Sequence, residues 1–132
     1  MNITINKLVN KKEKNMEAKQ LCNEICNILL SKKARDIVKI NVADKTTLAD
    51  YFIIAGGTST SQVKSLCEYV DEGMSKLGVE VKRRDGESEG RWAVLDVGDC
   101  IVHIFNDETR LFYHLERLWG DERTIEKIED NN

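Results

Sequence analysis

The chain has 132 residues, of which 41% are hydrophobic and 33% charged, and its formal net charge is −3. This length suits one domain with a single hydrophobic core, and the composition is ordinary for a globular protein. No apolar run approaches twenty residues and no apolar stretch follows the N-terminal lysines, so neither a membrane span nor a secretory signal is expected.

The charge is distributed unevenly along the chain. Residues 1–35 carry eight Lys/Arg against three Asp/Glu, a balance of +5, whereas residues 36–132 carry twelve against twenty, a balance of −8. An acidic folded part is poorly matched to the phosphates of nucleic acid and better matched to a basic protein partner. Little direct contact with nucleic acid is therefore expected.

Three segments are expected along the chain. Residues 1–15 are polar and basic with weak periodicity, which predicts a flexible basic extension, and Met16 is an alternative start of translation. Residues 16–120 hold the hydrophobic periodicity and are the predicted domain. Residues 121–132 are polar and acidic with little to bury, which predicts a frayed or disordered tail.

The first predicted helix spans residues 16–31. Its apolar residues Leu21, Ile25, Ile28 and Leu29 fall at i, i+4, i+7 and i+8. This spacing places all four on one side of a helix, so they are expected to face the core.

Four cysteines lie inside apolar patterns, at Cys22, Cys26, Cys67 and Cys100. The first two are one helical turn apart, which is compatible with metal ligation. No second Cys or His pair with ligand spacing completes such a site. Buried free thiols in a reducing cytoplasm are the preferred interpretation, and no metal is expected.

Two strands are predicted after the first helix. Residues 36–42 alternate between apolar and polar types, and residues 43–49 follow as a loop. Residues 51–55 form a continuous apolar run that ends at Gly56 and Gly57. Such a run is typical of a central strand that is buried on both faces of its sheet.

A second helix follows several candidate N-cap residues at positions 58–61. Its apolar residues are spaced by three and four and are Val63, Leu66, Cys67, Val70, Met74 and Leu77. Gly78 is expected to end the helix. Residues 79–83 then predict a short edge strand, and residues 84–90 predict a polar loop.

A β-hairpin is predicted from residues 91–97 and 100–105 around a two-residue turn at Gly98 and Asp99. The implied pairing gives one wholly apolar face, made of Ala93, Leu95, Val97, Cys100, Val102 and Ile104. The other face sets Trp92 opposite Phe105, Val94 opposite His103, and Asp96 opposite Ile101. Two interpretations of this mixed face remain open: helices cover it, or its Trp92 and Asp96 end stays open to a partner.

The last predicted helix places its core stripe at Leu111, Leu115 and Leu118. Tyr113 lies about 200° around the helix from this stripe, on a face that it shares with Glu116 and Arg117. Gly120 is expected to end the helix. The element order α-β-β-α-β-β-β-α predicts an α/β fold, with a mixed sheet of about five strands and helices packed on it.

A nucleotide site is the main chemical alternative. The turn from Gly56 to Ser59 joins a buried strand to a helix, a geometry that can bind phosphate. It lacks the Walker lysine and the G-x-G-x-x-G pattern. A nucleotidyltransferase also needs closely placed carboxylates for two metal ions, and no strand here offers Asp-x-Asp. A tight structural turn is the preferred interpretation.

The two histidines and one strand carboxylate are candidate acid–base groups. No Ser or Cys elbow accompanies His103 or His114, so a packed and hydrogen-bonded structural role is favoured for each. Asp96, in an apolar strand, is compatible either with a functional site or with a carboxylate tied to the adjacent turn.

Three motifs resemble the Iojap-like ribosomal silencing factor family. They are L-A-D-Y-F-I-I-A-G-G-T-S-T-S-Q-V at 48–63, G-E-S-E-G-R-W-A-V-L-D-V-G-D-C-I-V-H-I-F at 86–105, and R-L-F-Y-H-L-E-R-L-W at 110–119. They occur in the family's order and spacing, and the resemblance covers about residues 17–120. It implies a nucleotidyltransferase-like topology without the catalytic carboxylates, in agreement with the missing Asp-x-Asp.

The resemblance also implies a function. Family members bind the large ribosomal subunit through its fourteenth protein, block joining of the small subunit and repress translation when nutrients are scarce. The expectation is therefore a cytoplasmic, non-enzymatic protein without a cofactor, often a homodimer. A nucleotidyltransferase-like phosphotransfer or nucleotide-binding enzyme is the alternative.

The family's contact residues carry over onto this sequence by motif. Trp92 and Asp96 match W-x-x-x-D of its contact strand, and Tyr113 matches the aromatic of its last-helix motif. Leu111 and Glu116 match the same motif. Asp99 and His103 match G-D-x-x-V-H, for which the resemblance implies structural roles. Many relatives have Thr-Gly where this chain has Gly56 and Gly57, a change that leaves the turn feasible.

Overall fold

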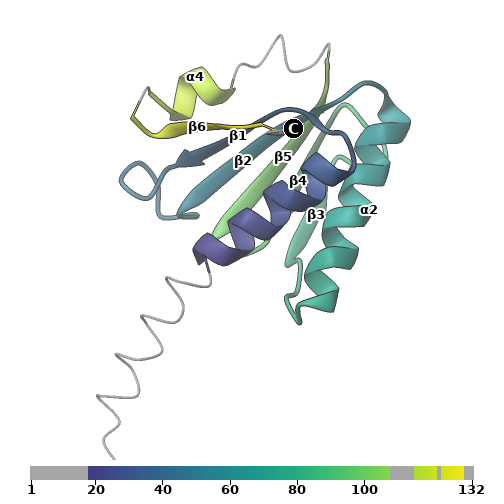
Figure 1. Cartoon of the computed structure of the whole chain (residues 1–132), viewed down its shortest axis with the longest axis horizontal. Helices are drawn as coiled ribbons and strands as arrows, with labels where there is room; N and C mark the ends of the chain where they lie inside the picture. Colours follow the sequence, from purple (N-terminus) through teal and green to yellow (C-terminus); the bar gives the residue numbers. More distant parts are fainter. Residues whose placement is uncertain (1–17, 108–114, 122, 130–132) are drawn as a thin grey trace, which may run out of the picture.

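The computed structural model describes residues 18–107, 115–121 and 123–129. Within them, six strands form one mixed sheet in the order β3-β4-β5-β2-β1-β6 (Figure 1). β2 and β5 run parallel, and the other described neighbours are antiparallel. The strands are β1 (Arg35–Asn41), β2 (Tyr51–Gly57), β3 (Arg83–Asp85), β4 (Trp92–Asp96), β5 (Cys100–Asn106) and β6 (Ile125–Ile128). The predicted α/β class is confirmed, with six strands in place of about five.

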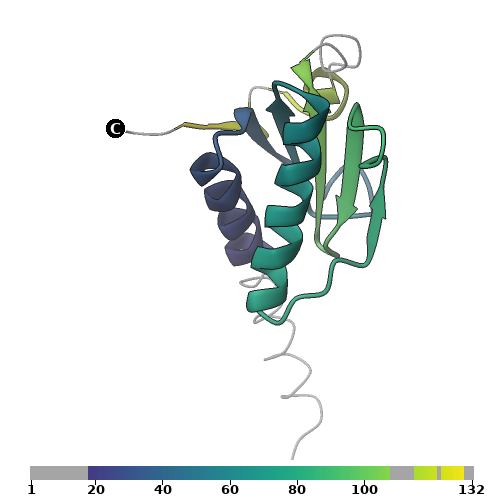
Figure 2. The ribbon, with the colours of Figure 1, turned by 90° about the vertical axis from the view of Figure 1, so that its right-hand side faces the viewer.

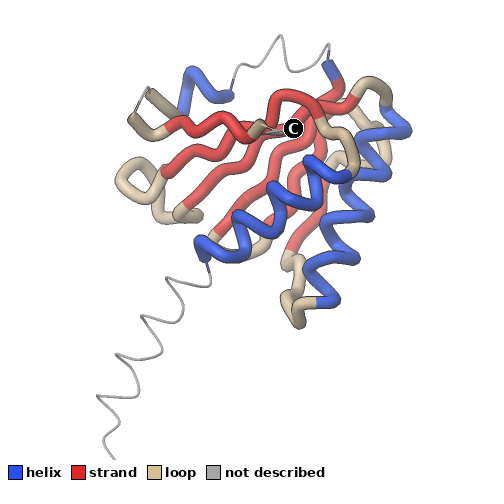
Figure 3. Tube along the Cα trace, viewed as in Figure 1, coloured by secondary structure: helices blue, strands red, loops and turns tan. Residues whose placement is uncertain are grey.

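Two long helices cover the first face of the sheet. They span residues 18–31 and α2 (Thr60–Lys76), and both lie on the same side of the strands (Figures 2 and 3). Their buried side chains and one face of the strands form the main core. Among the described residues, no helix has the length and apolarity that crossing a membrane requires.

The ends of α2 follow from local chemistry. The Ser59 hydroxyl accepts a hydrogen bond from the Gln62 N–H at 3.1 Å and so caps the first turn. At the other end Gly78 adopts φ +74°, and the Val79 N–H donates to the Met74 carbonyl at 2.9 Å. The predicted C-terminal glycine is confirmed. Leu77, expected in the core stripe, is instead 52% exposed because it lies at the C-cap, beyond the last helical turn that packs on the sheet.

The predicted hairpin is confirmed in register. Trp92 pairs with Phe105, Val94 with His103 and Asp96 with Ile101. The six residues predicted for its apolar face are all buried in the main core, namely Ala93, Leu95, Val97, Cys100, Val102 and Ile104. The Val97 N–H donates to the Cys100 carbonyl at 2.9 Å and closes the turn.

Two strands differ from the expectations. The edge strand was predicted at residues 79–83, but β3 begins only at Arg83. Pairing with β4 starts where the Lys82 N–H donates to the Asp96 carbonyl at 2.8 Å. Val79 and Val81 are partly buried against the core without strand pairing. The prediction of a frayed tail is wrong for Ile125–Ile128, which forms β6 and pairs antiparallel with β1.

β3 is tied to α2 by an ion cluster centred on Arg84. Its guanidinium contacts Glu68 at 2.7 Å and also pairs with Asp71 and Glu87. The Arg84 side chain is partly buried, so these contacts are less screened than ordinary surface pairs. The cluster holds the short edge strand and its following loop against the helix layer.

The last helix is described over α4 (Leu115–Trp119). Leu118, predicted in its core stripe, is 73% exposed, so that assignment is wrong. Trp119, the next residue, packs onto the sheet instead. Leu111 lies outside the described residues, and so do the surroundings of the Leu115 side chain.

Candidate functional site

The second face of the sheet carries an aromatic row, defined here as Trp92, Phe105, His103, Phe52 and Trp119. Trp92 stacks on Phe105 with ring centroids 5.0 Å apart and planes at 23°. Phe52 meets His103 edge-on at 5.2 Å and Trp119 edge-on at 5.1 Å. The row therefore runs from β4 across β5 and β2 to α4, and it forms part of a second, smaller core.

The second face of the sheet is packed by a loop and part of α4, whereas the first face is covered by two long helices. Val42 and Ala49, from the loop between β1 and β2, pack into the smaller core, and Trp119 reaches it from α4. Lys45 Nζ donates to the Trp119 carbonyl at 2.9 Å and joins the loop to that helix. Trp92 lies at the margin of this cover and remains half-buried.

The indole of Trp92 makes a stacking contact and a hydrogen bond. Its ring lies on Phe105, the residue opposite it in the hairpin. Its Nε1–H donates to Nδ1 of His103 at 3.1 Å, across the diagonal of the same hairpin. The one polar atom of the ring is thus satisfied within the protein.

The chain in front of Trp92 is closely packed. Gly86 adopts φ +79° and Gly90 φ +68°, and the Gly90 N–H donates to the Gly86 carbonyl at 3.2 Å. A Cβ on Gly90 would lie 2.7 to 2.9 Å from atoms of Thr60 at the start of α2. The loop over residues 86–90 is therefore folded tightly between β4 and α2, where a side chain at either glycine has no room.

His103 is buried and uncharged. It is 8% exposed, and desolvation lowers its pKa from 6.5 to about 4. Because Nδ1 accepts the hydrogen bond from Trp92, the ring proton is assigned to Nε2. That Nε2 has no hydrogen-bond partner among the residues the structure describes. The predicted packed, hydrogen-bonded role of His103 is confirmed.

The buried imidazole makes stability depend on pH. The folded pKa lies below the unfolded value, so the unfolded chain takes up the proton first as the pH falls from about 6.5 towards 4. The free energy of unfolding should therefore drop by about 3 kcal/mol on this account between pH 7.5 and 4. Urea titrations of wild type and His103→Asn at several pH values measure it. If the free energies of unfolding of the two proteins fall in parallel with pH, the pKa of His103 is the same in the folded and unfolded chain, and the prediction is wrong.

Asp96 lies at the other end of β4 from Trp92. The two residues share a face but are four positions apart, about 13 Å along a strand, so the structure does not bring them into one contact. Asp96 Oδ1 accepts from the Gly98 N–H at 2.8 Å. This turn-capping bond accords with the turn-adjacent interpretation and leaves the carboxylate half-exposed.

The structure does not describe the surroundings of the remaining predicted contact residues. Leu111 and Tyr113 lie outside the described residues, as do His114 and the surroundings of the Glu116 side chain. Their assignment to the contact surface stays a prediction. The neighbouring helix residue Arg117, predicted on the same face as Tyr113, is exposed.

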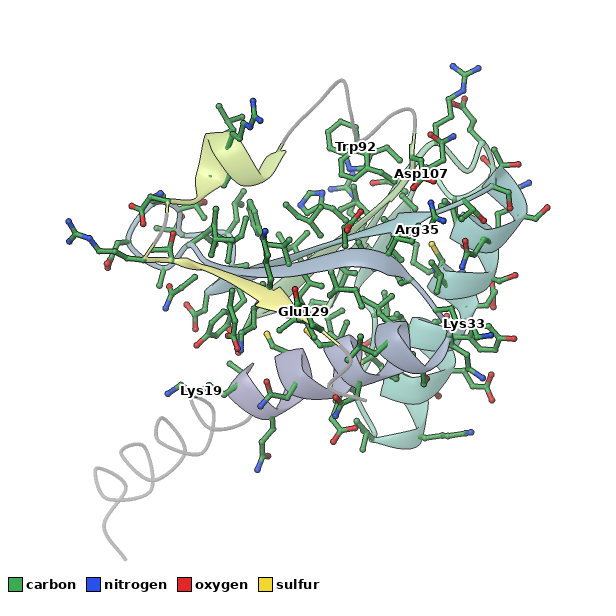
Figure 4. The ribbon with its side chains drawn as sticks, turned by 45° about the horizontal axis from the view of Figure 1, so that its top comes forward. Lys19, Lys33, Arg35, Trp92, Asp107 and Glu129 are labelled. Carbon is green, nitrogen blue, oxygen red and sulfur yellow. The ribbon has the colours of Figure 1, made fainter. Side chains whose placement is uncertain are left out.

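An ion pair at the Trp92 end of the sheet was not predicted from the sequence. Arg35 Nη1 lies 3.0 Å from Asp107 Oδ2, and Figure 4 shows both near the end of the sheet where Trp92 lies. The strand register explains the placement, because Trp92, Phe105, Gly56 and Arg35 follow one another across β4, β5, β2 and β1. Local periodicity contains no signal for this pair, which is 72 residues apart in the chain.

In the turn before α2, several hydrogen-bond donors are bonded to acceptors within the protein. The Thr58 N–H and hydroxyl both donate to Gln62 Oε1, at 2.6 and 2.9 Å, while the Gln62 N–H donates to Ser59. Gly56 and Gly57 lie within β2, and a Cβ on Gly57 would approach Val63 to 3.0 Å. This arrangement favours the structural-turn interpretation over phosphate binding, because several donors that a phosphate needs are occupied.

The four cysteines are buried free thiols, as predicted. Burial raises the pKa of Cys26 and of Cys67 to about 12 and that of Cys100 well above its usual value. Thiols of this kind stay protonated and are poor nucleophiles and ligands. Within the described part of the chain, no group of three His, Cys, Asp or Glu side chains is placed to hold a metal ion.

Comparison with known proteins identifies a consistent set of relatives. A family model described as "Ribosomal silencing factor during starvation" matches residues 15–132. A ribosomal silencing factor of Halalkalibacterium halodurans is 35% identical over 111 residues, which cover 84% of this chain and 95% of the relative. The mouse protein named "Mitochondrial assembly of ribosomal large subunit protein 1" is 31% identical over 72% of this chain and 43% of its own length. A crystal structure of a Chromobacterium violaceum protein superposes with a TM-score of 0.76 at 30% identity, covering 79% and 88% of the two chains.

Proposed function

This chain belongs to the ribosomal silencing factor family, and we propose that it binds the large ribosomal subunit through that subunit's fourteenth protein. In this proposal it occupies the face that the small subunit would meet, prevents the subunits from joining and represses translation under nutrient limitation. The activity takes place on cytoplasmic ribosomes. It requires no cofactor.

The observation that carries the proposed contact site is the placement of Trp92. Two helices cover the first face of the sheet, so that face serves the core. On the second face Trp92 is stacked and hydrogen-bonded, and the residue is only partly buried. Large aromatic side chains held in this way are the residue type that most often dominates the energy of a protein interface.

The charge of the folded part supports a basic protein as the partner. Residues 36–132 carry twelve Lys/Arg and twenty Asp/Glu. In the proposal, Asp96 and Glu116 pair with Lys or Arg of the ribosomal protein, while Tyr113 and Leu111 add apolar contacts beside Trp92. The name of the mouse relative, which refers to assembly of the large ribosomal subunit, points to the same class of partner.

The proposed action is steric and non-enzymatic. The relatives are named as silencing factors, and the donors of the turn before α2 are occupied within the protein. We also propose that the free protein forms a homodimer. The competing proposal, a nucleotidyltransferase-like enzyme, predicts transfer or saturable binding of labelled nucleotides in the presence of Mg²⁺, and turnover in that assay would replace the silencing proposal.

Co-sedimentation with purified ribosomal subunits tests the proposal directly. The protein should pellet with large subunits and not with small ones, because the proposed partner protein belongs to the large subunit alone. Adding small subunits afterwards should yield fewer joined ribosomes than in a control without the protein. Equal pelleting with both subunits, or joining at the control level, contradicts the proposal.

A further inference from the structure

We propose that His103 is a positioning residue for Trp92. In this inference its Nδ1 selects the one orientation of the indole in which the exposed part of the ring meets the partner. The inference rests on the proposed function, because it concerns how the contact site is prepared for binding. His103 itself is buried and does not touch the partner.

The first step is that stacking alone does not fix the indole. A ring lying on Phe105 keeps its apolar contact in either of two flipped orientations about χ2, since this torsion is broad and roughly two-fold for aromatic side chains. The two orientations place Nε1 on opposite sides. The hydrogen bond of 3.1 Å from Nε1 to His103 selects the orientation in which the polar edge points inward.

The second step is that His103 is suited to act as a constant acceptor. It lies in the interior of the aromatic row, edge-on to Phe52 at 5.2 Å. Its burial keeps it neutral, so Nδ1 retains its lone pair over the physiological pH range. A protonated imidazole would have no acceptor, and the indole would lose its partner.

The third step is that packing alone does not explain a histidine at position 103. Its Nε2 is buried and has no partner among the described residues, which is an unfavourable arrangement for a polar atom. An apolar side chain of similar size would avoid that cost and fill the same space. The hydrogen bond to Trp92 is an interaction that an apolar side chain could not supply, and it gives the buried imidazole a role in orienting the indole.

An anchor that is already oriented binds more tightly because less freedom is lost on association. Four variants test this through binding to purified large subunits. His103→Leu removes the acceptor, His103→Asn keeps an acceptor oxygen near the position of Nδ1, Trp92→Phe removes the donor and keeps an aromatic ring, and the fourth variant combines His103→Leu with Trp92→Phe.

The expected results form a double-mutant cycle. His103→Leu should weaken binding about tenfold, because the freed indole then turns its Nε1–H toward water and only about a tenth of the population keeps the binding orientation. His103→Asn should stay within about threefold of wild type. In the Trp92→Phe background, His103→Leu should weaken binding by no more than about twofold, because the bond is already absent. Equal effects of His103→Leu in both backgrounds would overturn the proposal. If His103→Leu does not fold, Trp92→Phe removes the bond from the donor side and His103→Asn is the control that keeps the acceptor. Wild-type affinity of Trp92→Phe would then overturn the proposal.

The indole N–H resonance gives a readout that does not depend on binding. In ¹⁵N–¹H spectra the resonance of Trp92, identified by its absence in Trp92→Phe, should shift and exchange faster in His103→Leu but not in His103→Asn. An unchanged resonance in His103→Leu overturns the contact itself. A changed resonance together with wild-type affinity overturns the positioning role.

Failure of the inference can be distinguished from failure of the proposed function. If wild type does not bind large subunits, the proposed function fails. In that case the spectra still establish or refute the contact, and the positioning role for binding falls with the function. If wild type binds and Trp92→Ala binds equally well, Trp92 does not contribute to the contact and the positioning role is wrong. Only binding that is sensitive to Trp92 and to His103 through the same bond supports the inference.

Discussion

Replacement of Gly86 by alanine is expected to lower the free energy of unfolding by about 3 kcal/mol or more. Gly86 has φ +79°, a left-handed conformation that costs an L-residue about 1–2 kcal/mol. In addition, a Cβ there would lie 2.0 Å from the carbonyl oxygen of Trp92 and 3.4 Å from Cα of Ala93. Backbone atoms cannot swing aside as a side chain can, so the loop or the start of β4 must move.

Gly78→Ala is a matched control for this prediction. Gly78 has φ +74°, and apart from its chain neighbours no heavy atom of the described residues lies within 4 Å of the position that a Cβ would take. Its substitution should therefore cost about 1–2 kcal/mol, the conformational part alone. Urea unfolding of the two variants measures the difference. Equal destabilisation would mean that the close approach of Gly86 to Trp92 contributes nothing.

Replacement of Trp92 by alanine is expected to weaken binding to the large subunit by about 30-fold to several hundred-fold, or about 2–3 kcal/mol or more. The indole supplies a large apolar surface with little rotamer freedom, and its edge is already hydrogen-bonded inward. Most of the loss should appear as faster dissociation. Affinities of folded wild type and variant for purified large subunits, compared at one salt concentration, measure it.

Tyr69→Ala is the control for loss of an exposed aromatic side chain. Tyr69 is 40% exposed on α2, on the layer opposite the second face, with Lys32 Nζ 4.2 Å from its ring centroid. Its removal should leave binding within about twofold of wild type. Tyr113→Ala, at the other predicted aromatic anchor, should weaken binding as Trp92→Ala does. Unchanged binding by both Trp92→Ala and Tyr113→Ala would refute the site assignment.

The hairpin shows how far local pattern can reach. A two-residue turn fixes the register of the strands on either side. The pairing of Trp92 with Phe105 and the buried apolar face could therefore be predicted from the sequence. The same register places His103 diagonally across from Trp92. The hydrogen bond between them could not be predicted, because it depends on the rotamers of both rings and on the neighbouring Phe52.

β6 and the exposure of Leu118 could not be predicted, because one depends on long-range strand pairing and the other on where a helix ends. Ile125 and Ile128 are separated by Glu126 and Lys127, a pattern without strand alternation. Their strand exists because it pairs with β1, where Glu126 also meets the mostly buried Lys39 at 3.2 Å. Leu118 satisfied helical spacing but lies in the last turn of α4, where the adjacent Trp119 takes the place on the sheet.

The position of β6 also has a consequence for the newly made chain. β1 is synthesised early, but the strand that covers its outer edge is the last strand the structure describes. During translation the growing polypeptide can assemble β1 to β5 while that edge still presents unpaired N–H and C=O groups. The vulnerable interval for unwanted strand pairing therefore lasts until Ile125–Ile128 has left the exit tunnel of the ribosome that makes it.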